Sequence, residues 1–178
     1  MNRVSLIAIA ALLITSPAIA ASVGESTGVN ATLGIAPKTA DFVTEAATSD
    51  MLEIASSQIA LQKGSAEDKA FAQQMITDHT KTSNELKALA TQSDVNAPLP
   101  AGLDSSSQKS LDSLNADKAE DFSADYESMQ LKAHKDAVSL FQRYADGGDN
   151  AALKDWAAKT LPALQHHLEM AKMLPKNQ

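Results

Sequence analysis

Three of the four histidines in this 178-residue chain fall on three different predicted helices, each on the apolar side of its helix: His79, His134 and His167. Imidazole is a frequent ligand of transition metals, and it gains or loses a proton near neutral pH. Histidines that converge from separate helices therefore predict a metal centre or a small-ligand site. The fourth, His166, is expected to face solvent.

Acidic and amide side chains accompany these imidazoles. Glu53, on the first predicted helix, is a candidate fourth ligand, and Asp50 lies on the apolar stripe of the same helix. Asp78 and Gln130 are candidates to hydrogen-bond the imidazoles and so to decide which ring nitrogen carries the proton. One carboxylate and three imidazoles favour a single transition metal ion, namely zinc, iron, manganese or copper(II).

A second interpretation of the same histidines is structural. A histidine on an apolar helix face usually hydrogen-bonds a neighbour and does nothing further. The protein would then be a non-catalytic structural or protein-interaction component of the cell envelope. The sequence contains no Ser-His-Asp arrangement, phosphate-binding glycine loop or paired-carboxylate motif. No catalytic residue is therefore predicted, and a metal-dependent oxidoreductase ranks below both interpretations.

Four amphipathic helices are predicted to position these residues. Apolar side chains recur at helical spacing within about 39–64, 65–93, 117–146 and 149–174. Ser65-Ala66-Glu67-Asp68 resembles a capping box that begins the second helix, and Asp149 is the predicted cap of the fourth. The prolines and glycine of 96–102 end the second helix, and Asp104 is expected to cap a short helix that presents Leu111 and Leu114.

These elements predict an all-α, up-down-up-down four-helix bundle with a crossover segment between the second and third helices. With both hairpin turns at one end of the bundle, His79 and His134 lie about 21 Å from that end and His167 about 27 Å. Glu53 lies at about 16 Å and Asp50 at about 21 Å on the same count. The three rings are therefore expected to meet.

Residues 1–20 have the features of a secretory signal peptide: a basic start at Arg3, an apolar run, and the small-residue end Ala18-Ile19-Ala20. Cleavage before Ala21 predicts a periplasmic or secreted protein. Residues 21–37 are expected to form a flexible leader, and 38–175 the folded domain. No later segment has the roughly 20 apolar residues that a transmembrane helix needs.

Composition narrows the partners and cofactors. The chain has no cysteine, which excludes disulfides, thiolate ligands and covalently attached c-type haem. Without the signal it carries 14 basic and 22 acidic residues, a net charge of −8. That charge argues against a nucleic-acid partner.

Segments along nearly the whole mature chain resemble the exported bacterial family called domain of unknown function 4142. They are Asp41-Phe42-Val43, 51–55, 71–80, 122–126, Ala133-His134, Thr160-Leu161-Pro162 and His167-Leu168. The resemblance implies a ferritin-like four-helix fold without a settled activity, in a family often labelled as outer-membrane proteins. Carried over residue by residue, the polar positions of the family's bundle fall on Glu53, Asp78, His79, His134 and His167.

The sequence departs from the ferritin di-iron pattern, because neither His79 nor His167 belongs to a Glu-x-x-His motif. Ferroxidase chemistry is therefore not predicted. The leading hypothesis is an exported bundle that binds one transition metal ion, or a small ligand, in envelope stress protection. Under the second, structural interpretation, the acidic surface is expected to contact another envelope protein.

Overall fold

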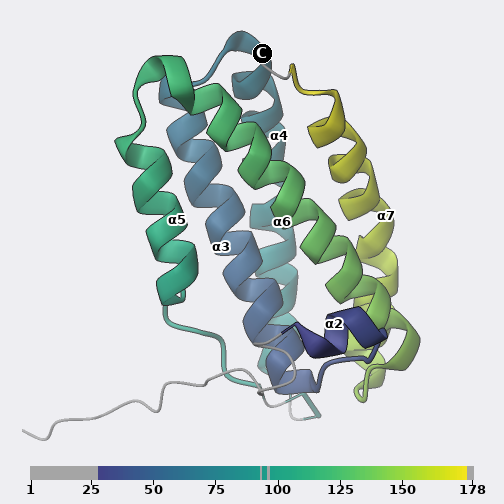
Figure 1. The fold of residues 1–178 in the computed structure, drawn as a ribbon. Coiled ribbons are helices and arrows are strands. Elements are labelled where there is room, and N and C mark those ends of the chain that lie inside the picture. The colour runs from purple at the N-terminus through teal and green to yellow at the C-terminus, as the bar shows by residue number, and fades with distance from the viewer. Residues whose placement is uncertain (1–27, 93, 96, 176–178) are drawn as a thin grey trace, which may run out of the picture.

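The computed structural model describes residues 28–92, 94–95 and 97–175, so the predicted signal peptide and the first part of the leader lie outside the described residues. Within these ranges the protein is all-α, as predicted, and contains no strand. Its helices are α2 (Val29–Leu33), α3 (Thr39–Lys63), α4 (Ala66–Ala90), α5 (Ser105–Ala116), α6 (Ala119–Gly147) and α7 (Ala151–Met173) (Figure 1). None of these helices combines the length and the hydropathy needed to span a bilayer.

The helix starts follow from local side-chain hydrogen bonds. The Ser65 hydroxyl accepts from the Asp68 amide at 3.0 Å, and the Asp68 carboxylate accepts from the Ser65 amide at 2.9 Å. The predicted capping box is therefore confirmed, with aspartate in the usual glutamate position. Asp104 caps α5 as predicted.

The predicted cap of the last helix is wrong by one residue. Asn150 has extended backbone angles, and its side chain accepts from the Leu153 amide at 3.0 Å, so Asn150 caps α7. Asp149 instead accepts from the backbone amide of Thr39 at 3.0 Å. It therefore joins the turn between α6 and α7 to the start of α3.

Hydrogen bonds between helix ends give the direction of each helix. At the end marked by Asp149 and the start of α3, Asn150 also donates to the Asp94 carbonyl just after α4, at 3.0 Å. At the opposite end, the Ser123 hydroxyl near the start of α6 donates to Asp68 near the start of α4, at 2.5 Å. Helices α4 and α6 therefore run in the same direction, and α3 and α7 run in the other.

The predicted up-down-up-down order is therefore wrong. The connection after α4 does not lead straight into α6, because α5 first carries the chain back along α3 to the opposite end of the molecule (Figure 1). The α3–α4 and α6–α7 turns consequently lie at opposite ends rather than at one end. The heights of His79 and His134 along the bundle change little, because each residue lies near the middle of its helix. Reversing the direction of a helix leaves its middle at the same height.

Two hydrophobic clusters fill the interior. The Phe42 cluster is built around Phe42, which stacks on Tyr144 with ring centroids 3.9 Å apart and meets Phe141 and Trp156 edge-on. The Tyr126 cluster is built around Tyr126 with Phe71 and Phe122. Helix α5 contributes the buried Leu114 to the Tyr126 cluster.

A layer of buried polar side chains separates the two clusters along all four long helices. On α7, for example, Leu164 belongs to the Phe42 cluster, Ala171 belongs to the Tyr126 cluster, and His167 lies between them. We call this the polar layer; its members are Asp50, Glu53, Ser56, Ser57, His79, Gln130, His134 and His167.

Residues 28–37 are the described part of the predicted leader. Residues 28–37 contain α2, and Pro37 is buried. Arg143 of α6 donates to the backbone carbonyl of Ile35 at 2.7 Å. These contacts hold residues 28–37 against the domain.

Truncation of the aromatic centre should be costly. Phe42→Ala is expected to lower the free energy of unfolding by about 3–5 kcal/mol, because it removes a fully buried ring that three other aromatic rings contact. Urea denaturation measures this change. The control Leu33→Ala, at a side chain that is 66% exposed, should stay within about 0.5 kcal/mol of the wild type. Equal effects of the two substitutions would contradict this description of the core.

Candidate metal centre

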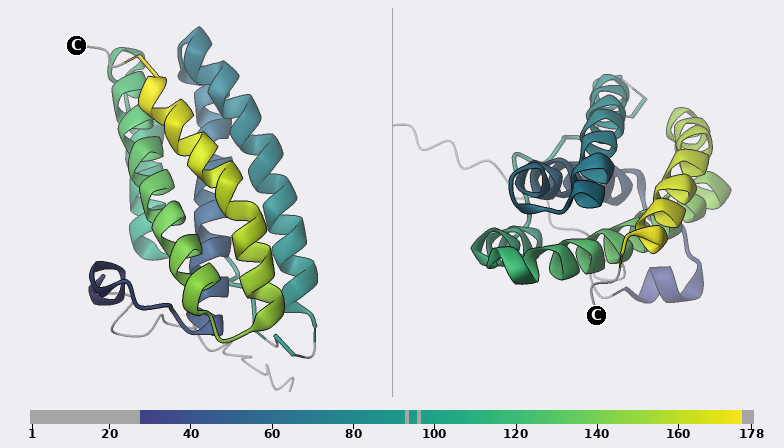
Figure 2. Two further views of the ribbon diagram at one scale, coloured as in Figure 1. Left: turned by 90° about the vertical axis from the view of Figure 1, so that its right-hand side faces the viewer. Right: turned by 90° about the horizontal axis from the view of Figure 1, so that it is seen from above.

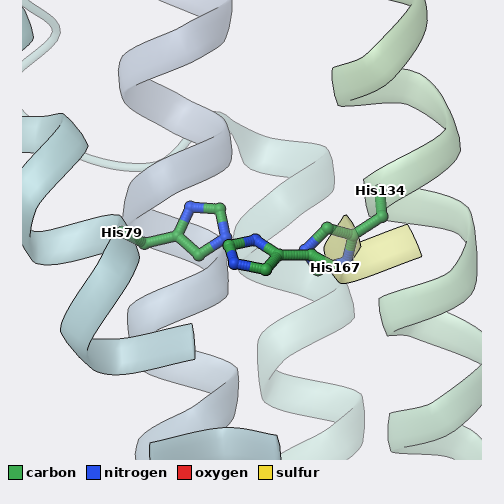
Figure 3. A group of neighbouring side chains, drawn as sticks. All are labelled: His79, His134 and His167. Carbon is green, nitrogen blue, oxygen red and sulfur yellow. The ribbon is translucent and has the colours of Figure 1, made fainter. Parts of the chain in front are cut away.

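His79, His134 and His167 meet in the middle of the polar layer. Their rings point toward one another from α4, α6 and α7 (Figure 3), with ring centroids 5.4–5.6 Å apart. One ring nitrogen from each histidine lies within 4.8 Å of the other two. All three residues are at most 3% exposed. The predicted convergence of the three imidazoles is thus confirmed.

Each imidazole is held by one ring nitrogen. His79 Nδ1 lies 2.7 Å from Asp50 Oδ1, and His167 Nε2 lies 2.8 Å from Asp78 Oδ2. His134 Nδ1 lies 2.9 Å from the backbone carbonyl oxygen of Gln130. A carbonyl or carboxylate oxygen only accepts, so the nitrogen beside it carries the hydrogen and donates.

The second nitrogen of each ring has no hydrogen-bond partner among the described residues, although it is buried. These atoms are His79 Nε2, His134 Nε2 and His167 Nδ1. In a neutral imidazole whose other nitrogen is protonated, this atom carries a lone pair. The arrangement therefore offers three nitrogen lone pairs in the interior of the protein.

Two of the rings, those of His134 and His167, have lowered pKa values and are therefore neutral at neutral pH. Burial, together with the charge of His79, lowers the pKa of His134 to about 4. Burial likewise lowers the pKa of His167 to about 4, against the opposing effect of the hydrogen bond that His167 donates to Asp78. For His79, burial also acts to lower the pKa, but the Asp50 hydrogen bond and the nearby Glu53 charge outweigh it and the net pKa is raised.

Both carboxylate oxygens of Asp50 take part in hydrogen bonds. Beyond the hydrogen bond to His79, its Oδ2 accepts from Thr82 at 2.8 Å and from Ser83 at 3.1 Å. The two hydroxyls follow His79 by one turn on α4, which places them on the same side of the helix. Sequence reasoning missed both of them, although their spacing from a candidate histidine was a usable signal.

The other two predicted partners of the rings, Asp78 and Gln130, lie close to the histidines, but both make different contacts than expected. Asp78 supports His167 on another helix rather than its sequence neighbour His79. Gln130 supports His134 through its backbone carbonyl, while its side-chain amide donates to Ser56 at 3.1 Å.

Glu53 lies beside the group of three histidines rather than within it. Its Oε1 is 3.9 Å from His134 Nδ1, the nitrogen that faces Gln130. The residue is 1% exposed, and neither carboxylate oxygen has a hydrogen-bond partner among the described residues. Burial raises the pKa of Glu53 to about 7. His166 is exposed, as the sequence predicted.

Three neutral imidazoles can coordinate a divalent ion and leave further coordination positions for other ligands. Zinc–nitrogen distances of about 2.0–2.1 Å place tetrahedral nitrogens about 3.4 Å from one another. Closure of the three rings around an ion therefore needs side-chain shifts of about 1 Å.

The comparisons with known proteins place the chain in a family. The family model described as "Domain of unknown function (DUF4142)" matches residues 24–174. The protein therefore belongs to this family. No curated protein and no solved structure matches the chain at a significant level.

Glu53→Gln should stabilise the metal-free protein above neutral pH. The unfolded chain loses the Glu53 proton near pH 4.5, whereas the native state keeps it until about pH 7. Wild-type stability should therefore fall as the pH rises through this window, at about 1.4 kcal/mol per pH unit. A glutamine has no proton to lose, so the advantage of the variant should grow toward about 3 kcal/mol at pH 7.5.

Urea denaturation of both proteins in a chelating buffer at pH 4.5 and 7.5 measures this difference. The exposed residue Glu120 supplies the control, because Glu120→Gln should change stability little at either pH. A Glu53→Gln effect of the same size at both pH values would show that the native carboxyl group does not retain its proton.

Proposed function

We propose that this protein binds one divalent transition metal ion through His79, His134 and His167, for sequestration or stress protection in the cell envelope. The observation that carries the proposal is the set of three buried ring nitrogens that have no hydrogen-bond partner in the described part of the chain. A buried polar atom without a hydrogen bond costs about 1–3 kcal/mol, and three such atoms facing one point are rarely retained without a ligand.

The hydrogen-bond acceptors behind the three imidazoles favour a metal-binding role over a purely structural one. A histidine that ligates a metal usually donates its other N–H to a carboxylate or a backbone carbonyl, and all three rings do so here. Structural histidines need only one such contact, and they do not require the second nitrogens to converge.

The donor set narrows the choice among the metals considered from the sequence. Three imidazoles suit zinc and copper(II), and also iron, whereas manganese prefers carboxylate oxygens. Glu53 is buried, with Oε1 3.9 Å from His134 Nδ1, and it is proposed to offset part of the charge of the ion rather than to be one of its primary ligands.

For the scaffold and its location we propose a ferritin-like four-helix bundle formed by α3, α4, α6 and α7, with α5 as the crossover. Export through the segment 1–20 would place this bundle in the periplasm or outside the cell. The close pairing of α3 with α4 and of α6 with α7 supports this arrangement. The lack of a Glu-x-x-His motif at His79 or His167 separates the proposed centre from di-iron chemistry.

Removal of one imidazole should abolish stoichiometric metal binding. The wild-type protein, purified from the exported fraction, is expected to carry about one equivalent of zinc or copper(II). His134→Ala should reduce this to a small fraction, because two imidazoles and no thiolate hold such ions weakly. Elemental analysis of the purified proteins measures the metal content.

His166→Ala is the matched control, since it removes an exposed imidazole adjacent to His167 and should retain full metal content. A wild-type protein that stays metal-free after incubation with zinc and with copper(II), and that is folded, would contradict the proposal. That result would favour the structural interpretation of the histidines.

The two carboxylates that accept hydrogen bonds from the imidazoles should increase the affinity for zinc. Asp50→Asn and Asp78→Asn each weaken the acceptor that orients one imidazole, so each should lower zinc affinity by about 10- to 100-fold. Competition with a chromophoric chelator measures the affinity. Asp136→Asn, at an exposed carboxylate paired with Lys132, should leave it unchanged. Unaltered affinity in both test variants would show that these carboxylates do not support the ligands.

A further inference from the structure

A cleft between α4 and α7 leads from the surface to two of the three histidines. It has a volume of about 440 Å³, and His79 and His167 are among the residues that line it. His134 and Glu53 do not line the cleft and lie on α6 and α3. The proposed centre is therefore enclosed on one side by α3 and α6 and approached on the other between α4 and α7.

The cleft exists because α4 and α7 are the least tightly packed neighbours among the four long helices. Seen from above, α4 stays beside α3 and α7 beside α6, and the contact between α4 and α7 is much smaller (Figure 2). The lining of α7 includes the small side chains of Thr160 and Ala163, which leave space. Helix α5 packs on α3 and α6 and does not cover this opening.

Lys81 and Lys159 both line the cleft, and Lys81 forms an ion pair with Glu85 at 3.9 Å. Glu85 accepts from the indole of Trp156 at 3.0 Å, and Asp78 accepts from His167 and Gln74. Both carboxylates are therefore engaged. The exposed ammonium group of Lys159 lines the same cleft and forms no ion pair with any of the described residues.

We propose that the metal centre is an open site, whose remaining coordination position faces the α4–α7 cleft and takes a small anionic ligand from solution. This inference rests on the proposed metal binding. An imidazole that ligates a metal is neutral, so the three ligands themselves cancel none of the charge of a divalent ion. The ion therefore attracts an anion, and Lys159 adds a second attraction at the entrance. A volume of about 440 Å³ lies within the range of small-molecule sites.

Cobalt(II) with azide as the probe tests this inference. Cobalt(II) replaces zinc at imidazole sites, and its visible spectrum reports both its binding and a change of ligands. The cobalt-loaded wild type should develop visible bands that depend on His134, and azide should shift these bands in a saturable manner.

A variant that fills the cleft tests the route to the metal. Ala163→Trp places a large ring in the cleft, so it should keep cobalt bound while raising the apparent azide dissociation constant at least about tenfold. Ala158→Trp is the matched control, because Ala158 is also exposed on α7 and is not part of the lining. Lys159→Gln should weaken azide binding at low ionic strength and lose this effect at high ionic strength.

Each outcome decides one of the two proposals. If no cobalt bands appear in the folded protein, the metal centre fails and the open site fails with it. If the bands appear but azide does not change them, the metal proposal stands and the open site is overturned. Equal azide affinity in Ala163→Trp and Ala158→Trp would also overturn the proposed route through the cleft. A selective loss in Ala163→Trp supports it.

Discussion

The rest of this structure depends on the burial of a polar layer across four helices. Carboxyl, hydroxyl and imidazole groups at the middle of a helical core are stable only when they hydrogen-bond one another. Asp50 therefore joins α3 to α4 through His79, and Asp78 joins α4 to α7 through His167. Within the polar layer, the buried side-chain atoms that have no hydrogen-bond partner among the described residues are one nitrogen of each of the three histidines, both carboxylate oxygens of Glu53 and Oε1 of Gln130.

The two hydrophobic clusters make this layer possible. Each long helix contributes apolar residues to both clusters, so the helices are held together above and below the polar layer. The imidazoles can then be positioned by packing as well as by hydrogen bonds, as the edge-on contact between Phe71 and His134 illustrates. A centre supported in this way is preorganised, and a ligand needs only small side-chain movements to bind.

The path of the chain explains why the centre has an accessible side. The short turns force α3 against α4 and α6 against α7, and α5 lies over α3 and α6 on its way back. Among the residues that the structure describes, no connecting segment crosses the remaining face, between α4 and α7. The opening to His79 and His167 is thus a consequence of topology combined with the small side chains of Thr160 and Ala163.

The four long helices, the capping box at Ser65 and the three candidate histidines could be predicted from the sequence, because helical periodicity and capping are local properties. The directions of the helices, the carboxylate that supports each ring and the position of Glu53 could not be predicted in this way. Asp78 contacts His167 from another helix, and Asp149 contacts Thr39 rather than capping α7. Contacts of this kind depend on which helices become neighbours. The packing of the whole domain sets these neighbours, and the spacing of residues along one segment does not.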